Sequence, residues 1–89
     1  MYTLEVKVKS IKGECAAGYK AGDVFTVTDP VVVSQNNCPL CVYALSAMLP
    51  YLTAAYRYTA EGDWINRVTE LQCPDQANAV VFTITRRQI

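Results

Sequence analysis

The sequence predicts an α+β domain of the order ββαββ, in which a mostly antiparallel sheet packs on one kinked central helix. Apolar and polar residues alternate near both ends of the chain, which is typical of strands with one face in water. The middle of the chain has no charged residue between Asp29 and Arg57 and is long enough for a helix. With 89 residues, the chain is expected to form a single domain over residues 1–89.

The first half of the chain has the pattern of two strands joined by a glycine-rich loop. Leu4, Val6 and Val8 alternate with charged residues, and the next apolar segment is rich in β-branched residues. Asp29-Pro30 is a strand-breaking pair. We therefore predict a strand to about Ile11, a loop over 12–22, a strand over Val24–Thr28 and a short extended piece over 31–33.

The central helix has a predicted start and a predicted defect. Asn37 or Cys38 is suited to the N-cap position, and Pro39 to the first helical position, where its missing N–H costs nothing. We expect the helix to run to about Tyr58. Pro50 removes one helical hydrogen bond, so a kink or a break is expected there.

Only one narrow side of this helix is polar, and it consists of residues spaced three or four apart: Ser46, Pro50, Thr53 and Arg57. The remaining surface is apolar: Leu45, Met48, Leu49, Tyr51, Leu52, Ala55 and Tyr56. One small sheet cannot cover so wide an apolar surface. We therefore predict a homo-oligomer that assembles through the central helix.

The last third of the chain predicts two more strands. Trp64-Ile65 is an apolar anchor, and apolar residues alternate clearly near the C-terminus. The segment between the two strands is rich in turn-forming residues. The predicted elements are a strand over 68–73, a loop over 74–78 and a strand over 80–85.

The charge balance argues against nucleic acid and membrane partners. Eight basic and eight acidic residues cancel, so no global field attracts a polyanion. Lys7, Lys9, Arg86 and Arg87 are better interpreted as a solvated sheet face than as a nucleic-acid site. The apolar stretch is barely long enough to cross a membrane, and Pro50 lies within it.

A cytoplasmic location is expected, because charges alternate from the first residues, where a secretory signal has an apolar core. In a reducing compartment, four cysteines are better interpreted as thiols or metal ligands than as disulfides. They are Cys15, Cys38, Cys41 and Cys73.

The pair Cys38-Pro39-Leu40-Cys41 is the best-defined chemical feature. It looks like the active-site motif of glutaredoxins, over these four residues only, and N–H groups at a helix start stabilise a thiolate. If the protein is a thiol-redox enzyme, Cys38 is the nucleophile and Cys41 the resolving thiol. However, two strands precede the motif, which is not the usual context. The alternative is structural: Cys38 caps the helix and Cys41 packs as a small apolar residue.

A metal site that joins all four cysteines is a second hypothesis. Structural zinc sites usually contain two close pairs, whereas this chain has one pair and two isolated cysteines. Cys15 and Cys73 lie in loops from which they could turn toward the helix start. The ligand set of this hypothesis is Cys15, Cys38, Cys41 and Cys73, with zinc favoured over an iron–sulfur cluster.

Several motifs together give a wider resemblance. They are the segment from Gly13 to Asp23, Cys38-Pro39, Leu49-Pro50 and Cys73-Pro74-Asp75. Over its full length the sequence resembles a family of short uncharacterised bacterial and archaeal proteins with these motifs. The resemblance implies cysteines at positions 15, 38 and 73, and commonly a histidine where this chain has Tyr19, which would form a natural metal set. This chain has no histidine, so any ligand role at that position is lost or passes to Cys41.

The absence of histidine also excludes the usual protease triads and the usual neutral-pH base. Whether the protein is an enzyme is left open. The function predicted is a non-catalytic cytoplasmic module with a cysteine cluster near the helix N-terminus, which is structural or binds a metal or small ligand. The alternative is a thiol-redox protein that uses Cys38 and Cys41.

Overall fold

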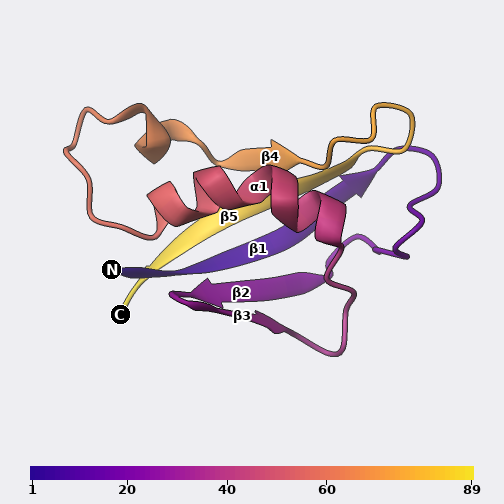
Figure 1. Cartoon of the computed structure of the whole chain (residues 1–89), viewed down its shortest axis with the longest axis horizontal. Helices are drawn as coiled ribbons and strands as arrows, with labels where there is room; N and C mark the ends of the chain where they lie inside the picture. Colours follow the sequence, from indigo (N-terminus) through magenta and orange to yellow (C-terminus); the bar gives the residue numbers. More distant parts are fainter.

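The computed structural model describes all residues, 1–89, as a two-layer α+β fold in which one helix lies across one face of a five-stranded sheet (Figure 1). All strand pairs are antiparallel, and the spatial order is β3-β2-β1-β5-β4. The predicted fold class is confirmed. The elements are β1 (Tyr2–Ile11), β2 (Val24–Thr28), β3 (Val31–Ser34), α1 (Val42–Ala55), the 3-10 helix η1 (Trp64–Arg67), β4 (Glu70–Gln72) and β5 (Val80–Gln88).

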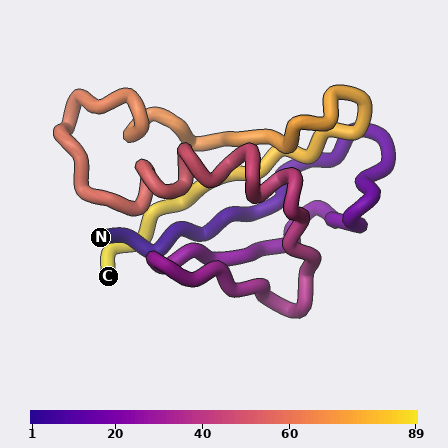
Figure 2. Tube along the Cα trace, viewed as in Figure 1, coloured from indigo at the N-terminus to yellow at the C-terminus, as the bar shows by residue number.

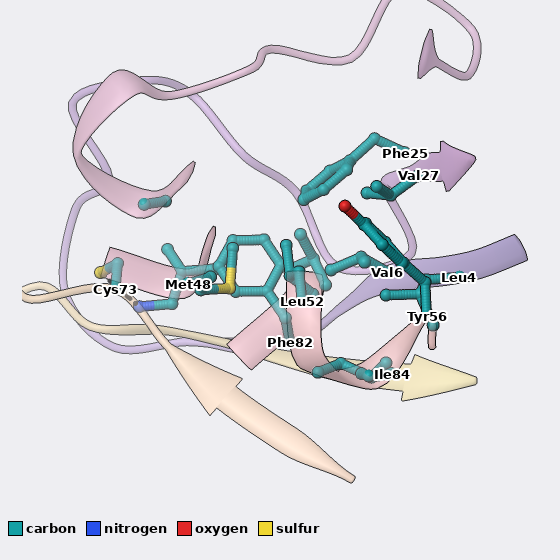
Figure 3. Close-up of a cluster of buried hydrophobic side chains, with 14 of the residues drawn as sticks. Leu4, Val6, Phe25, Val27, Met48, Leu52, Tyr56, Cys73, Phe82 and Ile84 are labelled. Atoms are coloured by element: carbon teal, nitrogen blue, oxygen red, sulfur yellow. Dashed lines mark hydrogen bonds between the residues drawn. The ribbon is translucent and has the colours of Figure 1, made fainter. Parts of the chain in front are cut away.

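The core lies between α1 and one face of the sheet. Alternate residues of the three central strands point into it, because side chains alternate along a strand. Leu4 and Phe82 are fully buried, and the opposite face of β1 carries the charged residues. Figure 3 shows these side chains as one continuous cluster, with Cys73 at one end and Tyr56 at the other.

The helix packs on the sheet through residues four or three apart, namely Ala44, Met48, Leu52 and Ala55. The predicted polar stripe lies opposite: Ser46, Pro50 and Arg57 are exposed and Thr53 is half-buried. Both faces are therefore as predicted. The helix runs without interruption through Pro50. The expected break is wrong, and the kink stays a prediction.

The predicted helix start is wrong by three residues. The helix begins at Val42, and its N-cap is Cys41, which makes no side-chain cap hydrogen bond. The segment before it is held by tertiary contacts instead. The Cys38 thiol donates to the Val24 carbonyl at 3.1 Å, and the Ser34 hydroxyl donates to the Cys38 carbonyl at 2.6 Å. These contacts hold Cys38 against the β2–β3 hairpin, outside the helix.

The strands near the C-terminus differ in length from the prediction. The predicted strand over 68–73 is reduced to β4, whereas β5 extends to Gln88. The chain before β4 forms η1, whose start is capped because Asp63 accepts a hydrogen bond from the Ile65 N–H at 3.0 Å. The apolar anchor at Ile65 is confirmed, since this side chain is buried.

The two ends of the sheet differ in what surrounds them. The chain termini lie together at one end, while the loops over 12–23 and 73–79 lie side by side at the other (Figure 2). These loops are joined where the Glu14 N–H donates to Asn78 Oδ1 at 2.9 Å. The Lys12 N–H donates to the Ala79 carbonyl at 2.8 Å. The loop pair therefore forms a fixed wall near the start of α1.

The basic residues of β1 and β5 do not form one free cluster. Lys9 pairs with Glu70 and Arg87 pairs with Glu5, both on the open face of the sheet. Arg86 lies on the helix side of β5 and donates to backbone carbonyls. No helix in this structure has the length and apolar character needed to cross a bilayer.

Candidate functional site

A cavity of about 250 Å³ lies where the loop pair meets the start of α1. Three segments supply its walls: the loop after β1, the first turn of α1 and the β4–β5 loop. Nine of its twelve lining residues are apolar. The lining residues are Cys15, Ala16, Ala17, Tyr19, Cys41, Tyr43, Ala44, Cys73, Pro74, Asp75, Asn78 and Val80.

Tyr19 connects the loop to the helix start. Its ring is 4% exposed and packs edge-on against Phe82, with ring centroids 5.3 Å apart. Its hydroxyl oxygen accepts a hydrogen bond from the Cys41 N–H at 3.0 Å. Burial raises the pKa of this phenol, so the hydroxyl keeps its proton at neutral and mildly alkaline pH. Tyr19 thus supplies the cap that no side chain within the helix provides.

Three of the four cysteines line this cavity. Cys73 is buried, and its sulfur accepts a hydrogen bond from the Val80 N–H at 3.2 Å. Cys15 and Cys41 are half-buried, and neither thiol makes a hydrogen bond within the protein. The cavity therefore presents two unengaged thiols and one engaged sulfur to whatever occupies it.

The β4–β5 loop is held rigid by its own polar groups. Asp75 Oδ1 accepts from the Ala77 and Asn78 N–H groups, both at 3.0 Å. The Asn78 amide in turn donates to Asp75 Oδ2 and accepts from the Glu14 N–H. The polar side chains of this loop are therefore engaged with each other and with the neighbouring loop. The Tyr19 hydroxyl differs from them, because it donates to no protein acceptor.

Cys38 lies outside the cavity. Its sulfur contacts the β2–β3 hairpin, as described above, and it is absent from the cavity wall. The structure thus brings Cys15, Cys41 and Cys73 to one cavity and does not bring all four cysteines to one point. It contains no group of three or more cysteine, aspartate or glutamate residues placed to hold a metal ion. The four-cysteine metal site stays a prediction without support from this geometry.

The redox hypothesis assumed that the helix start stabilises the Cys38 thiolate, and the position of Cys38 does not support this assumption. A helix start stabilises a thiolate only within the first turn, where N–H groups point outward. Cys38 precedes the helix by a full turn, and its thiol donates to a carbonyl. Cys41, expected to be the resolving thiol, is the residue at the helix start.

Two residues of the site were missed in the sequence. Tyr19 was considered only as the substitute for a histidine, and Asn78 only as a turn former. The available signal for Tyr19 was an aromatic residue inside a glycine-rich polar loop, where an apolar side chain needs a partner. Asn78 gave no such signal, because its role depends on a loop distant in sequence.

The cavity wall contains no lysine or arginine, and its single carboxylate, Asp75, lies at the exposed rim. The site can therefore accept a neutral apolar molecule without burying a charge, whereas an anion would meet no positive partner.

Comparison with protein-family models, with curated proteins and with solved structures found no match to this chain.

Proposed function

We propose that the protein is a non-catalytic binding module that takes a small, neutral, mainly apolar molecule in the cavity at the start of α1. The volume of about 250 Å³ supports this proposal. An apolar cavity of about 150 Å³ is large enough for benzene, so a substituted single ring or a short branched chain fits here. The predominance of apolar lining residues is also typical of small-molecule sites.

The thiols fit the same proposal as soft, polarisable contacts. Sulfur packs well against aromatic and aliphatic groups and needs no strong hydrogen-bond partner. Cys15 and Cys41 are free, which agrees with the proposed cytoplasmic location, where thiols stay reduced. Neither thiol has a histidine or other neutral-pH base beside it, so nothing in the cavity wall activates a nucleophile.

The test is a titration with toluene followed by ¹H–¹⁵N NMR. Saturable shifts are expected at residues 15–19, 41–44 and 73–80, because these segments form the cavity wall. Cys41→Phe fills the cavity and is expected to abolish these shifts. Cys38→Ala is the matched control, since Cys38 lies three residues away and outside the wall. An absence of saturable shifts, or equal loss in both variants, would contradict the proposal.

The redox alternative predicts a different result. It requires Cys38 to exchange with glutathione disulfide and to form a disulfide with Cys41. Mass spectrometry of the protein after oxidation distinguishes the two functions, because a binding module gives no Cys38–Cys41 disulfide on a catalytic timescale. Elemental analysis of anaerobically purified protein tests the metal hypothesis in the same preparation.

Self-association through α1 is part of the proposal. Val42 and Tyr43 are 70% and 73% exposed, and Leu49 and Tyr51 are exposed farther along the helix. No charge lies between Asp29 and Arg57, so two copies can meet there without like-charge repulsion. Light scattering on a size-exclusion peak is expected to show a dimer or larger, and Leu49→Lys to give a monomer. Thr85→Lys, on the open sheet face, is the control; a monomeric wild type would overturn this part.

A further inference from the structure

We infer that the molecule bound in the cavity carries a neutral hydrogen-bond acceptor, such as a carbonyl oxygen, that receives the hydroxyl proton of Tyr19. This inference rests on the proposed function and specifies the chemical class of the ligand. It follows from one hydroxyl group in the cavity wall that accepts one hydrogen bond and donates none within the protein.

The Tyr19 hydroxyl has one donor position and two acceptor positions. One acceptor position is filled by the Cys41 N–H at 3.0 Å, and this bond also fixes where the oxygen lies, at the wall that Cys41 forms. The hydroxyl donates to no protein acceptor, although the residue is 4% exposed. Because this hydroxyl lies in the cavity wall and has no protein acceptor, a bound molecule that accepts its proton gains one net hydrogen bond.

The buried tyrosine at the other end of the core shows what a satisfied hydroxyl looks like. Tyr56 is 6% exposed, and its hydroxyl donates to Asp29 Oδ1 at 2.8 Å. Tyr56 lines no cavity. The hydroxyl that donates to no protein acceptor is therefore the one on the buried tyrosine that lines the cavity.

The neighbouring groups restrict the acceptor to a neutral one. The cavity wall contains no cation to pair with an anionic ligand, and Asp75 at the rim disfavours negative charge. The Asn78 amide is engaged with Asp75 and Glu14 and is not free to recognise a second polar group. A ketone, aldehyde, ester or ether oxygen on an otherwise apolar body satisfies all of these conditions.

The experiment compares pairs of molecules that have nearly the same shape and differ in the acceptor. Acetophenone and α-methylstyrene form one pair, because a ketone oxygen is replaced by a methylene group; cyclohexanone and methylenecyclohexane form the second. We expect each ketone to bind wild-type protein about 3- to 10-fold more tightly than its partner, as one net hydrogen bond implies. Tyr19→Phe is expected to remove this preference, measured as the ratio of the two affinities for the same variant.

Tyr56→Phe is the matched control, since it removes the hydroxyl of a buried tyrosine distant from the cavity and should leave the ketone preference intact. The amide shift of Cys41 reports whether Tyr19→Phe leaves the start of α1 in place. Equal binding of ketone and hydrocarbon to wild type, or an equal loss of both in Tyr19→Phe, would overturn the inference while leaving the binding module standing. Failure of all four probes and of toluene to bind would overturn the proposed function itself.

Discussion

The two ends of α1 are built differently, although each lies beside a buried tyrosine. At the C-terminal end the Tyr56 hydroxyl donates to Asp29, and Arg86 of β5 donates to the Ala55 carbonyl in the last turn. At the N-terminal end the helix has no side-chain cap of its own and no acidic residue in its first turn. The space beside that turn is the cavity rather than packed side chains.

The C-terminal end is closed by Arg86. Its Nε donates to the Ala55 carbonyl at 2.8 Å, and its second terminal nitrogen donates to the Ile65 carbonyl at 2.8 Å. A cation at this position satisfies the Ala55 carbonyl at the end of α1 and complements the negative end of the helix dipole. The same guanidinium joins α1, η1 and β5, so it fixes the connection between helix and sheet.

The N-terminal end is held from outside the helix. The Tyr19 hydroxyl, from the loop after β1, accepts a hydrogen bond from the Cys41 N–H. Asn78 joins that loop to the loop before β5. These contacts position the cavity wall without filling the cavity. From this comparison we propose that stability is concentrated at the C-terminal end of α1 and binding at its N-terminal end, and the following predictions test that division.

The largest effect is expected for Arg86→Met. This change keeps much of the aliphatic stem but removes two charge-assisted hydrogen bonds. It leaves the Ala55 carbonyl without its donor, whereas the Ile65 carbonyl still accepts from the Val68 N–H. We expect a loss of about 3 kcal/mol in the free energy of unfolding, measured by urea denaturation. The cavity lies at the other end of α1, so toluene binding should persist in the folded fraction.

Arg87→Met is the control for this prediction. Arg87 is the next residue and carries the same charge, but it pairs with Glu5 at 2.8 Å on the open, solvated face of the sheet. Exposed pairs of this kind contribute about 0–1 kcal/mol. Similar destabilisation by the two changes would show that Arg86 has no special role at the helix end.

A smaller loss of stability, with a larger loss of binding, is expected for Gly13→Ala. Gly13 has φ of +71°, and a Cβ there would clash with Asn78 Oδ1 and lie 3.0 Å from the Ala77 carbonyl. We expect a loss of about 2 kcal/mol, since both backbone strain and the clash contribute. Displacing Asn78 moves one cavity wall, so toluene affinity should fall as well.

Gly18→Ala separates the two causes. Gly18 has φ of +84° in the same loop, but nothing lies within 4 Å of a Cβ built there. It is therefore expected to lose only the strain contribution, about 1 kcal/mol, and to bind toluene normally. If both alanine variants lose binding equally, the contact between Gly13 and Asn78 does not hold the cavity wall.

The sheet and the exposed side of α1 were more predictable than the two ends of this helix, and the reason is physical. Period-2 alternation predicted β1 with its end at Ile11, and richness in β-branched residues predicted β2 with its bounds. The spacing of Ser46, Pro50 and Arg57 likewise gave the exposed side of α1. These signals are local, so they can be read without knowledge of the tertiary structure.

The start of α1 was mispredicted because its determinants are not local. Pro39 favours a first helical position, but the hydrogen bonds from Cys38 to Val24 and from Ser34 to Cys38 hold the preceding segment on the hairpin. The true cap comes from Tyr19, far away in sequence. For the same reason, close sequence spacing placed Cys38 with Cys41, whereas the cavity brings Cys41 together with Cys15 and Cys73.

The smallest change in the free energy of unfolding is expected at alkaline pH, where Tyr19 and Tyr56, at the two ends of α1, both contribute. Burial raises the pKa of Tyr19, and the hydrogen bond to the Asp29 carboxylate raises the pKa of Tyr56. In the unfolded chain a tyrosine loses its proton near pH 10, so above that pH the folded state binds more protons than the unfolded state. The stabilisation from each neutral phenol is therefore complete below about pH 10 and is lost as the pH rises through the folded-state pKa.

Urea midpoints measured at pH 8 and at pH 11 test this linkage. Wild-type protein should lose stability between the two, and Tyr19→Phe and Tyr56→Phe should each lose less, because phenylalanine cannot ionise in the unfolded chain. Acetophenone extends this comparison of the two helix ends. As an acceptor for the Tyr19 proton, it should hold that phenol neutral and protect wild type and Tyr56→Phe at pH 11 more than Tyr19→Phe, which binds it without this hydrogen bond. Equal protection of all three proteins would show that the ketone does not accept the proton of the Tyr19 hydroxyl.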